Sequence, residues 1–211
     1  MPNRRAAPFI SFEGIDGAGK STQVQLLAER LRAAGQSVLT TREPGGSEGA
    51  EAIRSLLVEG DPGRWSAETE ILLFTAARRD HLEKVITPAV TRGETVITDR
   101  FADSTRVYQG AARADLRPLV DQLHQAMITT EPDLTLIIDC DPDAALARGL
   151  ARRSGEDRFE DMGADFQHRL RDGFHALARE FPNRCRLIPG DRTPEEVAAD
   201  VALAVAEAQN G

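Results

Sequence analysis

Phe12-Glu13-Gly14-Ile15-Asp16-Gly17-Ala18-Gly19-Lys20-Ser21-Thr22 is the stretch that decides the fold of this chain. It fits the phosphate-loop pattern G-x-x-x-x-G-K-[ST]. An apolar run, Pro8 to Phe12, precedes the loop and a helical pattern begins at Ser21, so strand, loop and helix follow in the required order. The alternative, a glycine-rich turn that binds nothing, leaves the lysine, the serine and the flanks unexplained. The stretch therefore predicts a P-loop NTPase fold that binds ATP or GTP.

The residue types of the loop indicate how it binds phosphate. Glycines allow backbone N–H groups to turn inward onto the phosphates, while Lys20 reaches the β- and γ-phosphate oxygens. The Ser21 hydroxyl is a suitable ligand for Mg²⁺. The expected nucleotide-binding residues are Gly14, Asp16, Gly17, Ala18, Gly19, Lys20, Ser21 and Thr22.

Composition limits the class of protein. The 211 residues are 41% hydrophobic, which suits one domain over 1–211 with a substantial core. The net charge of −8 argues against a nucleic-acid partner. No run approaches the roughly 20 apolar residues of a membrane span, and no apolar signal region follows the basic start. We therefore expect a cytoplasmic protein without a membrane or nucleic-acid partner.

Cysteines and histidines give no sign of a disulfide framework or a zinc site. Cys140 and Cys185 each stand beside an apolar, strand-like run, which favours buried reduced thiols. The histidines show no recognised ligand spacing, so we expect them at the surface or at edges. They are His81, His124, His168 and His175.

Apolar runs rich in β-branched residues alternate with helical patterns along the chain. Such alternation predicts an α/β fold with a parallel sheet flanked by helices. The expected strands are 9–12, 37–41, 95–98, 134–139 and 186–188. The helical pattern of 67–90 contains Pro88, which we expect to kink or end that helix.

The strand 95–98 ends in Asp99-Arg100-Phe101. Ligands of parallel sheets bind beyond the carboxyl ends of strands, so this position suits a ligand site. Asp99 is a candidate for organising Mg²⁺, and Arg100 for holding a phosphate bidentately. An Asp-Arg pair alone is more often a loop ion pair, but the phosphate loop favours the functional interpretation.

Phe74 and Arg78 are four residues apart and lie on one face of a predicted helix. Stacking on the ring and hydrogen bonding to the guanidinium would together hold a nucleobase. A core position for the phenylalanine is the alternative that spacing alone favours.

Arginines cluster again after the helix that begins beyond Pro142, over about 148–160. Together with neighbouring glycines they predict a basic lid that closes over a transferring phosphoryl group. A solvated charged loop is the alternative. The arginines are Arg148, Arg152, Arg153 and Arg158.

Five segments, FEGIDGAGKST, TREPGG, LLFTAAR, DRFADSTRVYQG and the arginines before DRFE, together resemble the thymidylate kinase (dTMP kinase) family of nucleoside monophosphate kinases. The resemblance covers position 9 to about 160. It implies a five-stranded parallel sheet, a homodimer, and phosphoryl transfer from ATP to dTMP with Mg²⁺, giving dTDP for dTTP synthesis.

The resemblance also implies roles for residues of the matching segments. Asp16 would contact the sugar 3′-hydroxyl, and Arg100 with Arg42 would hold the acceptor phosphate. Phe74 would stack on thymine and Arg78 would donate to its O4, whereas a ring at Tyr108 would crowd C2′ of a ribonucleotide. The implied substrate-binding residues are Asp16, Arg42, Glu43, Pro44, Phe74, Arg78, Arg100, Ser104, Thr105, Tyr108 and Gln109.

Two positions depart from the family pattern. Phe101 stands where tyrosine is frequent, so a hydroxyl contact is lost. Ala18 stands where some members carry a catalytic arginine, which assigns that role to the lid as in the bacterial type. Arg153 is the first candidate, with Arg148 and Arg152 in reserve, beside Lys20 and Asp99 as the other expected catalytic residues.

Two other functions stay open. One is a phosphotransferase on the same scaffold with another nucleoside or nucleotide acceptor. The other is a nucleotide-gated switch protein, which is disfavoured because its guanine-binding Asn-Lys-x-Asp segment is missing. None of Asn3, Asn183 and Asn210 is followed by lysine.

Overall fold

A computed structural model describes residues 7–59, 63–113, 115–152 and 163–210. Five parallel strands form one sheet in the order β2-β3-β1-β4-β5. This confirms the predicted parallel α/β sheet, and each expected strand is present to within two residues. The strands are β1 (Phe9–Glu13), β2 (Val38–Arg42), β3 (Thr95–Asp99), β4 (Leu134–Asp139) and β5 (Cys185–Pro189).

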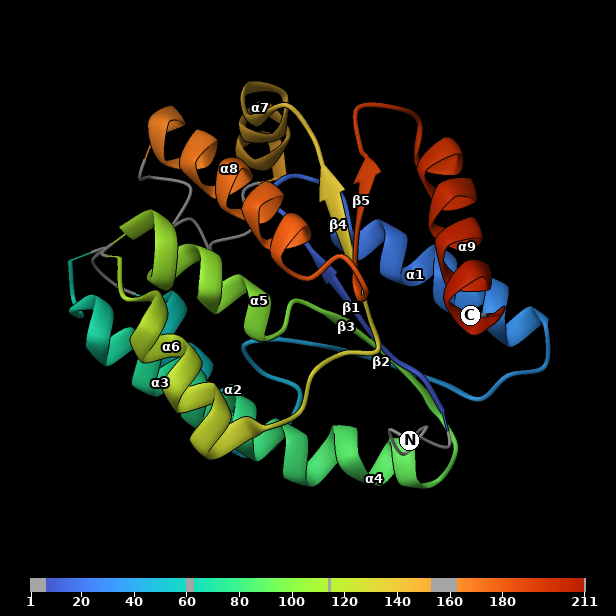
Figure 1. Ribbon diagram of the computed structural model, residues 1–211, viewed down its shortest axis with the longest axis horizontal. Helices are drawn as coiled ribbons and strands as arrows, with labels where there is room; N and C mark the ends of the chain where they lie inside the picture. Colours follow the sequence, from blue (N-terminus) through green and yellow to red (C-terminus); the bar gives the residue numbers. More distant parts are fainter. Residues whose placement is uncertain (1–6, 60–62, 114, 153–162, 211) are drawn as a thin grey trace.

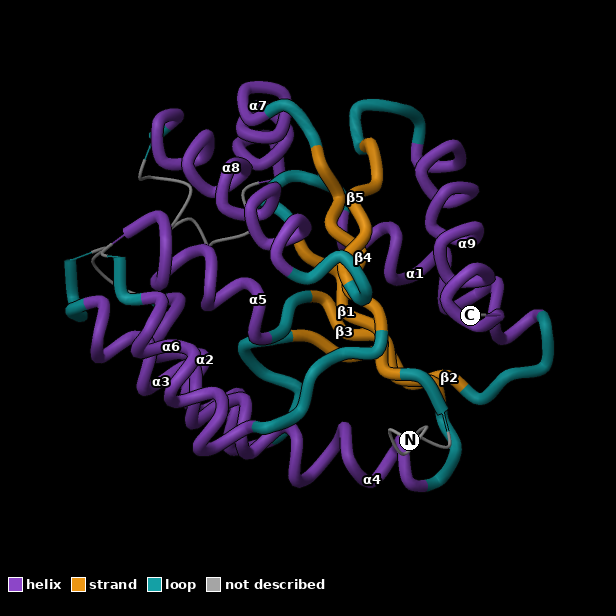
Figure 2. The backbone as a smooth tube through the Cα atoms, viewed as in Figure 1, coloured by secondary structure: helices purple, strands orange, loops and turns teal. Residues whose placement is uncertain are grey.

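Helices cover both faces of the sheet (Figures 1 and 2). Helices α1 and α9 lie side by side on one face, and α4 and α8 pack against the sheet from the other side. The α-helices are α1 (Lys20–Ala33), α2 (Glu48–Val58), α3 (Ala67–His81), α4 (Thr87–Thr91), α5 (Ala102–Thr105), α6 (Arg117–Leu123), α7 (Pro142–Arg152), α8 (Ala164–Glu180) and α9 (Pro194–Asn210). In the described part of the chain, no helix is long and apolar enough to cross a membrane.

The central strand β1 is buried along its whole length, so core residues lie on both of its faces. Neighbouring residues of a strand point to opposite faces. Accordingly, Phe9 belongs to a cluster with Val96 and Ile86, while Ile10 belongs to the larger cluster that contains Val24 and other residues of α1. Ligand-binding loops at the carboxyl end of β1 therefore rest on a rigid, buried strand.

Pro88 was expected to kink or end its helix, and the helix does not end there. Residues Leu82–Ile86 form a π-helical segment directly after α3, and Thr87–Thr91 continue as α4. Pro88 thereby falls in the first turn of α4, where the missing N–H removes no hydrogen bond. Two further π-helical segments follow α5 and α6, at Arg106–Arg113 and His124–Ile128.

Both cysteines are buried and free, as expected. Burial raises the pKa of the Cys185 thiol to about 12, with Asp103 adding to the effect. The surface position expected for the histidines is wrong for His81, which is 0% exposed, and for His124, which is also buried. The expectation failed because each buried ring has a carboxylate neighbour, Glu43 for His81 and Glu131 for His124, which the sequence does not reveal.

Candidate active site

The phosphate loop joins the buried end of β1 to the first turn of α1. Gly14 has φ +132°, and a Cβ there would lie 2.6 Å from the Ile138 carbonyl oxygen of β4. Gly17 has φ +77°, and a Cβ there would overlap the Ala145 carbonyl of α7. Glycine is therefore required at both positions by conformation and by close packing.

Lys20 and Ser21 begin α1 and lie at the mouth of the loop. The Lys20 ammonium donates to the Ile15 carbonyl across the loop at 2.8 Å. Burial lowers the pKa of Lys20, and the neighbouring Arg100 adds to this effect. Ser21 Oγ donates to Asp99 Oδ2 at 2.5 Å, so the hydroxyl and the carboxylate that sequence predicted as metal ligands are in contact. Two adjacent oxygens of this kind fit Mg²⁺, which binds few protein ligands beside substrate phosphates.

Arg100 links the loop to a second site. Its backbone, just after β3, is in the left-handed region at φ +71°. Nη1 donates to the Gly14 carbonyl at 3.0 Å and to Ser104 Oγ at 2.9 Å. Nη2 donates to Asp16 Oδ1 at 2.5 Å and to the Tyr108 hydroxyl at 3.1 Å. Tyr108 in turn donates to Asp16 Oδ2 at 2.9 Å, which closes a triangle of side chains.

Electrostatic interactions explain how Asp16 and Arg100 both remain charged although both are partly buried. Burial alone would raise the pKa of Asp16, but Arg100 and Lys20 outweigh it, and the pKa is lowered. Burial would likewise lower the pKa of Arg100, but Tyr108 and Asp16 oppose it, and the pKa is raised. Asp16 and Arg100 are therefore an ion pair at neutral pH, ready to exchange partners with a charged ligand.

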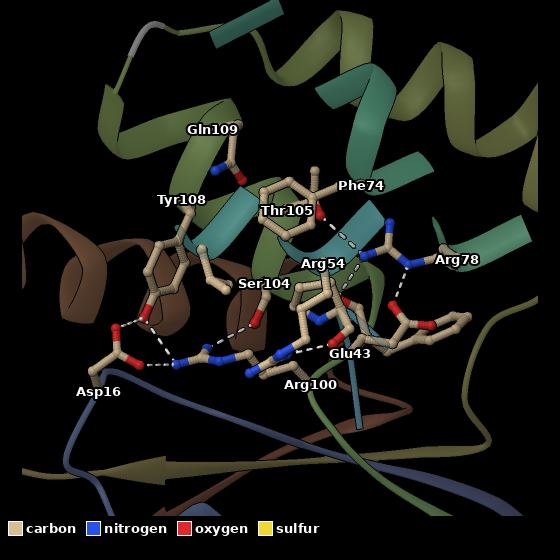
Figure 3. A pocket seen from close by; sticks show the side chains of 13 residues that line it. Asp16, Glu43, Arg54, Phe74, Arg78, Arg100, Ser104, Thr105, Tyr108 and Gln109 are labelled. Carbon is tan, nitrogen blue, oxygen red and sulfur yellow. Dashed lines mark hydrogen bonds and ion pairs between the residues drawn. The ribbon is translucent and has the colours of Figure 1, made fainter. Parts of the chain in front are cut away.

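Figure 3 shows the pocket that extends from this triangle towards α3. Ten of the eleven residues expected from sequence to bind substrate line it. They are Asp16, Glu43, Pro44, Phe74, Arg78, Arg100, Ser104, Thr105, Tyr108 and Gln109. The segments that carry them are far apart in the chain but meet at one edge of the sheet, beyond the carboxyl ends of β1, β2 and β3.

Arg78 and Phe74 form the end of the pocket opposite Asp16. Arg78 Nε donates to Glu43 Oε2 at 2.7 Å, and Nη2 donates to Thr105 Oγ1 at 3.0 Å and to the Phe101 carbonyl at 3.2 Å. Both members of the Arg78–Glu43 pair are about 5% exposed or less. Phe74 lines the cavity rather than the core, so the core alternative for it is wrong.

Three further residues that line the pocket were not predicted from sequence to bind substrate. They are Arg54, Val58 and Phe101. Arg54 and Val58 are four residues apart on α2, and Arg54 donates to the Pro44 carbonyl. The spacing was visible in the sequence, but nothing there indicated which face of α2 meets the pocket. Phe101 is fully buried and packs edge-on against Phe9, with ring centroids 5.0 Å apart.

Glu13 is another residue that sequence did not single out. It is 0% exposed and accepts hydrogen bonds from Phe101 N at 2.8 Å and Ser104 Oγ at 2.5 Å. Burial, reinforced by Asp103, raises the pKa of Glu13 to about 8. Its position directly before the phosphate-loop motif was a possible signal in the sequence.

The remaining expected residues lie elsewhere. Arg42 ends β2, is exposed and pairs with Glu51 at 3.2 Å, so it stands outside the described pocket lining. Arg148 lies on α7 and donates through Nε to the Gly17 carbonyl at 3.0 Å, which brings one candidate lid arginine onto the phosphate loop. Arg152 ends α7, and Arg153 and Arg158 lie outside the described residues.

A phosphate loop on a parallel sheet, with an arginine shared between it and a second pocket, defines a P-loop phosphotransferase of the nucleoside monophosphate kinase type. Comparison with known proteins gives the family. A family model described as thymidylate kinase matches residues 12–201. The chain therefore belongs to the thymidylate kinase family.

Individual relatives agree along nearly the whole chain. It is 64% identical to a thymidylate kinase of Jannaschia sp. (strain CCS1), with 94% of this chain and 96% of the relative covered. It is 69% identical to a thymidylate kinase of Dinoroseobacter shibae, covering 92% and 93%. The crystal structure of thymidylate kinase from Ehrlichia chaffeensis superposes with a TM-score of 0.76 at 38% identity, covering 94% and 98%.

Proposed function

We propose that the chain phosphorylates dTMP with ATP, giving dTDP and ADP, in the pocket of Figure 3. One observation carries the assignment of the site: Arg100 contacts the phosphate-loop residue Gly14 and also lines the second pocket. A donor held in the loop and an acceptor held in the pocket would thus meet at one guanidinium. Membership of the thymidylate kinase family supplies the identity of the acceptor.

The chemistry needs positioning more than proton transfer. A nucleoside monophosphate has a second pKa of about 6, so it is mostly dianionic at neutral pH and needs no general base. What remains is to hold two polyanions in line and to offset their repulsion. Lys20 supports the donor phosphates and Arg100 the acceptor phosphate, because both cations stand where the two sites meet.

Mg²⁺ is proposed as the metal, held by Ser21 and Asp99. Their oxygens already touch, and both are of the hard type that this ion prefers. When bound, the ion would offset charge on the donor phosphates. Asp99 would keep the Ser21 hydroxyl oriented towards it.

Thymidine is proposed to lie between the two ends of the pocket. Phe74 stacks on the base and Arg78 donates to thymine O4. Cytosine carries an amino donor at that position, which would leave two donors facing each other and one buried group unpaired. Asp16 accepts from the 3′-hydroxyl, and the Tyr108 ring limits the space beside C2′.

A lid arginine is proposed to stabilise the transferring phosphoryl group. Arg153 remains the first candidate, with Arg148 and Arg152 in reserve. The contact of Arg148 with the phosphate loop supports a lid that starts from α7.

The remaining proposals concern the whole molecule, a single cytoplasmic domain that forms a homodimer. Leu72 on α3 is 57% exposed and Met127 is 52% exposed. Arg79, seven residues after Leu72 and thus on the same side of α3, donates to the Met127 carbonyl at 2.8 Å. These apolar side chains therefore share a surface suited to a second copy. Light scattering that gives twice the monomer mass would support the dimer, and a monomer mass at all concentrations would refute it.

An acceptor panel tests the function. Purified protein with ATP and Mg²⁺ is offered dTMP, dUMP, dCMP, dGMP and thymidine, and ADP release is followed in a coupled assay. We expect dTMP to give the highest kcat/KM. Efficient turnover of another acceptor with none of dTMP would contradict the assignment, and acceptor-independent hydrolysis would favour the switch-protein alternative.

A further inference from the structure

His81 is a polar residue with no exposure to solvent, and both of its ring nitrogens contact polar side chains. Nε2 lies 2.7 Å from Thr41 Oγ1, and Nδ1 lies 3.0 Å from Glu43 Oε1. Thr41 lies in β2, and Glu43 is the first residue after that strand, whereas His81 is the last residue of α3. The ring therefore ties the end of this helix to the segment that enters the pocket.

The backbone closes over the same ring. A Cβ at Gly46 would overlap His81 Nε2, and Gly46 has φ +88°. The space beside the ring is thus filled by the turn that follows Pro44. A ring so enclosed has few alternative orientations, which makes it a rigid support.

The partners of the ring fix its hydrogen-bond direction. Glu43 is shared with the Arg78 guanidinium and, as a carboxylate, only accepts. Nδ1 of His81 must then carry the proton that is donated to Glu43 Oε1. In the neutral imidazole, Nε2 is left as an acceptor for the Thr41 hydroxyl. A chain of bonds thus runs from Thr41 through His81 to Glu43 and on to Arg78.

This chain leaves one part of Arg78 available. Nε is bonded to Glu43, and Nη2 is bonded to Thr105 and to the Phe101 carbonyl. Among the described residues, Nη1 makes no hydrogen bond, and in Figure 3 no dashed line joins it to another side chain of the pocket. Since Arg78 lines the pocket, a ligand atom is the natural partner for this donor.

We propose that His81 is a positioning residue for base recognition. By holding Glu43 through Nδ1 it fixes the rotation of the Arg78 guanidinium and keeps Nη1 directed at the base. His81 touches no substrate and acts only through Glu43. This inference rests on the proposed function, since it assumes that thymine occupies the pocket beside Arg78.

Two substitutions separate the two nitrogens. The amide nitrogen of His81→Asn takes the place of Nδ1 and keeps the bond to Glu43. The amide of His81→Gln takes the place of Nε2, where its oxygen accepts from Thr41 and no donor faces Glu43. We expect His81→Asn to raise KM for dTMP about threefold or less, and His81→Gln about tenfold or more. The values of kcat and of KM for ATP should stay within about twofold in both variants, because neither change reaches the phosphate loop.

The order of the two variants decides the outcome. A merely structural role predicts that glutamine, the longer side chain, replaces the ring better than asparagine. Equal KM values or a better glutamine variant would therefore overturn the proposal. The preference for dTMP over dCMP, taken as a ratio of kcat/KM, should fall in His81→Gln and persist in His81→Asn.

A folding failure would not leave the question open. Melting temperatures identify an unfolded variant, and Glu43→Asp then tests the same step, since a shorter carboxylate cannot reach both Arg78 and His81. It should raise KM for dTMP with kcat retained, and an unchanged KM would overturn the proposal. Failure of the proposed function looks different, because the parent protein itself would then not phosphorylate dTMP.

Discussion

The two arginines of the acceptor pocket are held in different ways. The Arg100 side chain, 16% exposed, binds Asp16, Tyr108 and Ser104, which themselves line the pocket. The Arg78 side chain, 5% exposed, is braced by Glu43, which His81 supports from behind. At the phosphate end of the pocket, around Arg100, the charged side chains bond to one another. At the base end, around Arg78, the Nη1 donor remains available to a ligand.

This difference has a consequence for ligand binding. An incoming phosphate must share Arg100 with Asp16, so binding rearranges an ion pair at the point where phosphoryl transfer takes place. A base meets a guanidinium whose geometry is already set, so little reorganisation is needed. Changes at the phosphate end should therefore affect turnover, and changes at the base end should affect affinity and selectivity.

Arg100→Ala should have the largest effect, because it removes the cation shared by the two sites. We expect kcat/KM for dTMP to fall about 10³-fold, with a large part of the loss in kcat. Steady-state kinetics with both substrates varied would measure it. Arg92→Ala is the control, since Arg92 is 60% exposed and pairs with Glu94, away from the pocket. A variant that lost affinity alone would show that the two ends do not differ as described.

Glu13→Gln should alter how the free energy of unfolding depends on pH. Glu13 lies beside the phosphate end of the pocket, where it accepts a hydrogen bond from Ser104. The pKa of Glu13 is raised from 4.5 to about 8, so the folded state retains a proton that the unfolded state has released. The stability from neutral Glu13 is complete below about pH 4.5 and is lost as pH rises towards 8. Between pH 5 and 8, the free energy of unfolding of the parent should fall by about 2–4 kcal/mol relative to that of Glu13→Gln.

Urea unfolding at several pH values measures that difference. Glu29→Gln on the exposed side of α1 is the control and should show no such trend. A constant offset between parent and Glu13→Gln across this range would contradict the raised pKa.

Arg78→Ala should act at the base end alone. Loss of a charged hydrogen bond raises KM for dTMP by about 10- to 100-fold, and kcat should change little. The preference for dTMP over dCMP should decrease as well. Arg92→Ala again serves as the control, because Arg92 is 60% exposed and pairs with Glu94 outside the pocket. Unchanged affinity and base preference in Arg78→Ala would refute this assignment.

Local sequence patterns predicted the sheet and the positions of Phe74, Arg78 and Arg100, whereas the other pocket residues were implied by resemblance to the thymidylate kinase family. Short β-branched runs gave the strands, and the ends of β1 and β3 placed Asp16 and Arg100 at one edge. The helix does not end at Pro88 because a π-helical segment precedes it and places the proline in the first turn of α4.

Side chains that meet only through tertiary structure could not be predicted. His81 and Glu43 are 38 positions apart, and no periodicity relates them. Arg54 and Val58 had the right helical spacing, but the face that α2 turns to the pocket depends on its packing against α3. Arg42 was expected at the pocket by resemblance to the family, yet the last residue of a strand can turn outward, as its pairing with Glu51 shows.

Tyr108→Phe should have the smallest effect, and it separates the ring from its hydroxyl. The hydroxyl donates to Asp16 and accepts from Arg100, so its loss weakens a cluster in which Asp16 and Arg100 still bind each other directly. We expect kcat/KM for dTMP to fall only about threefold, since the direct bond between Asp16 and Arg100 remains and offsets part of the loss of the two hydroxyl bonds. The ring remains, so discrimination between dTMP and its ribonucleotide counterpart should persist in Tyr108→Phe and decline in Tyr108→Ala. If Tyr108→Phe alone abolished turnover, the phosphate end would depend on the hydroxyl more than on the Asp16–Arg100 ion pair. The proposed difference between the phosphate end and the base end would then be wrong.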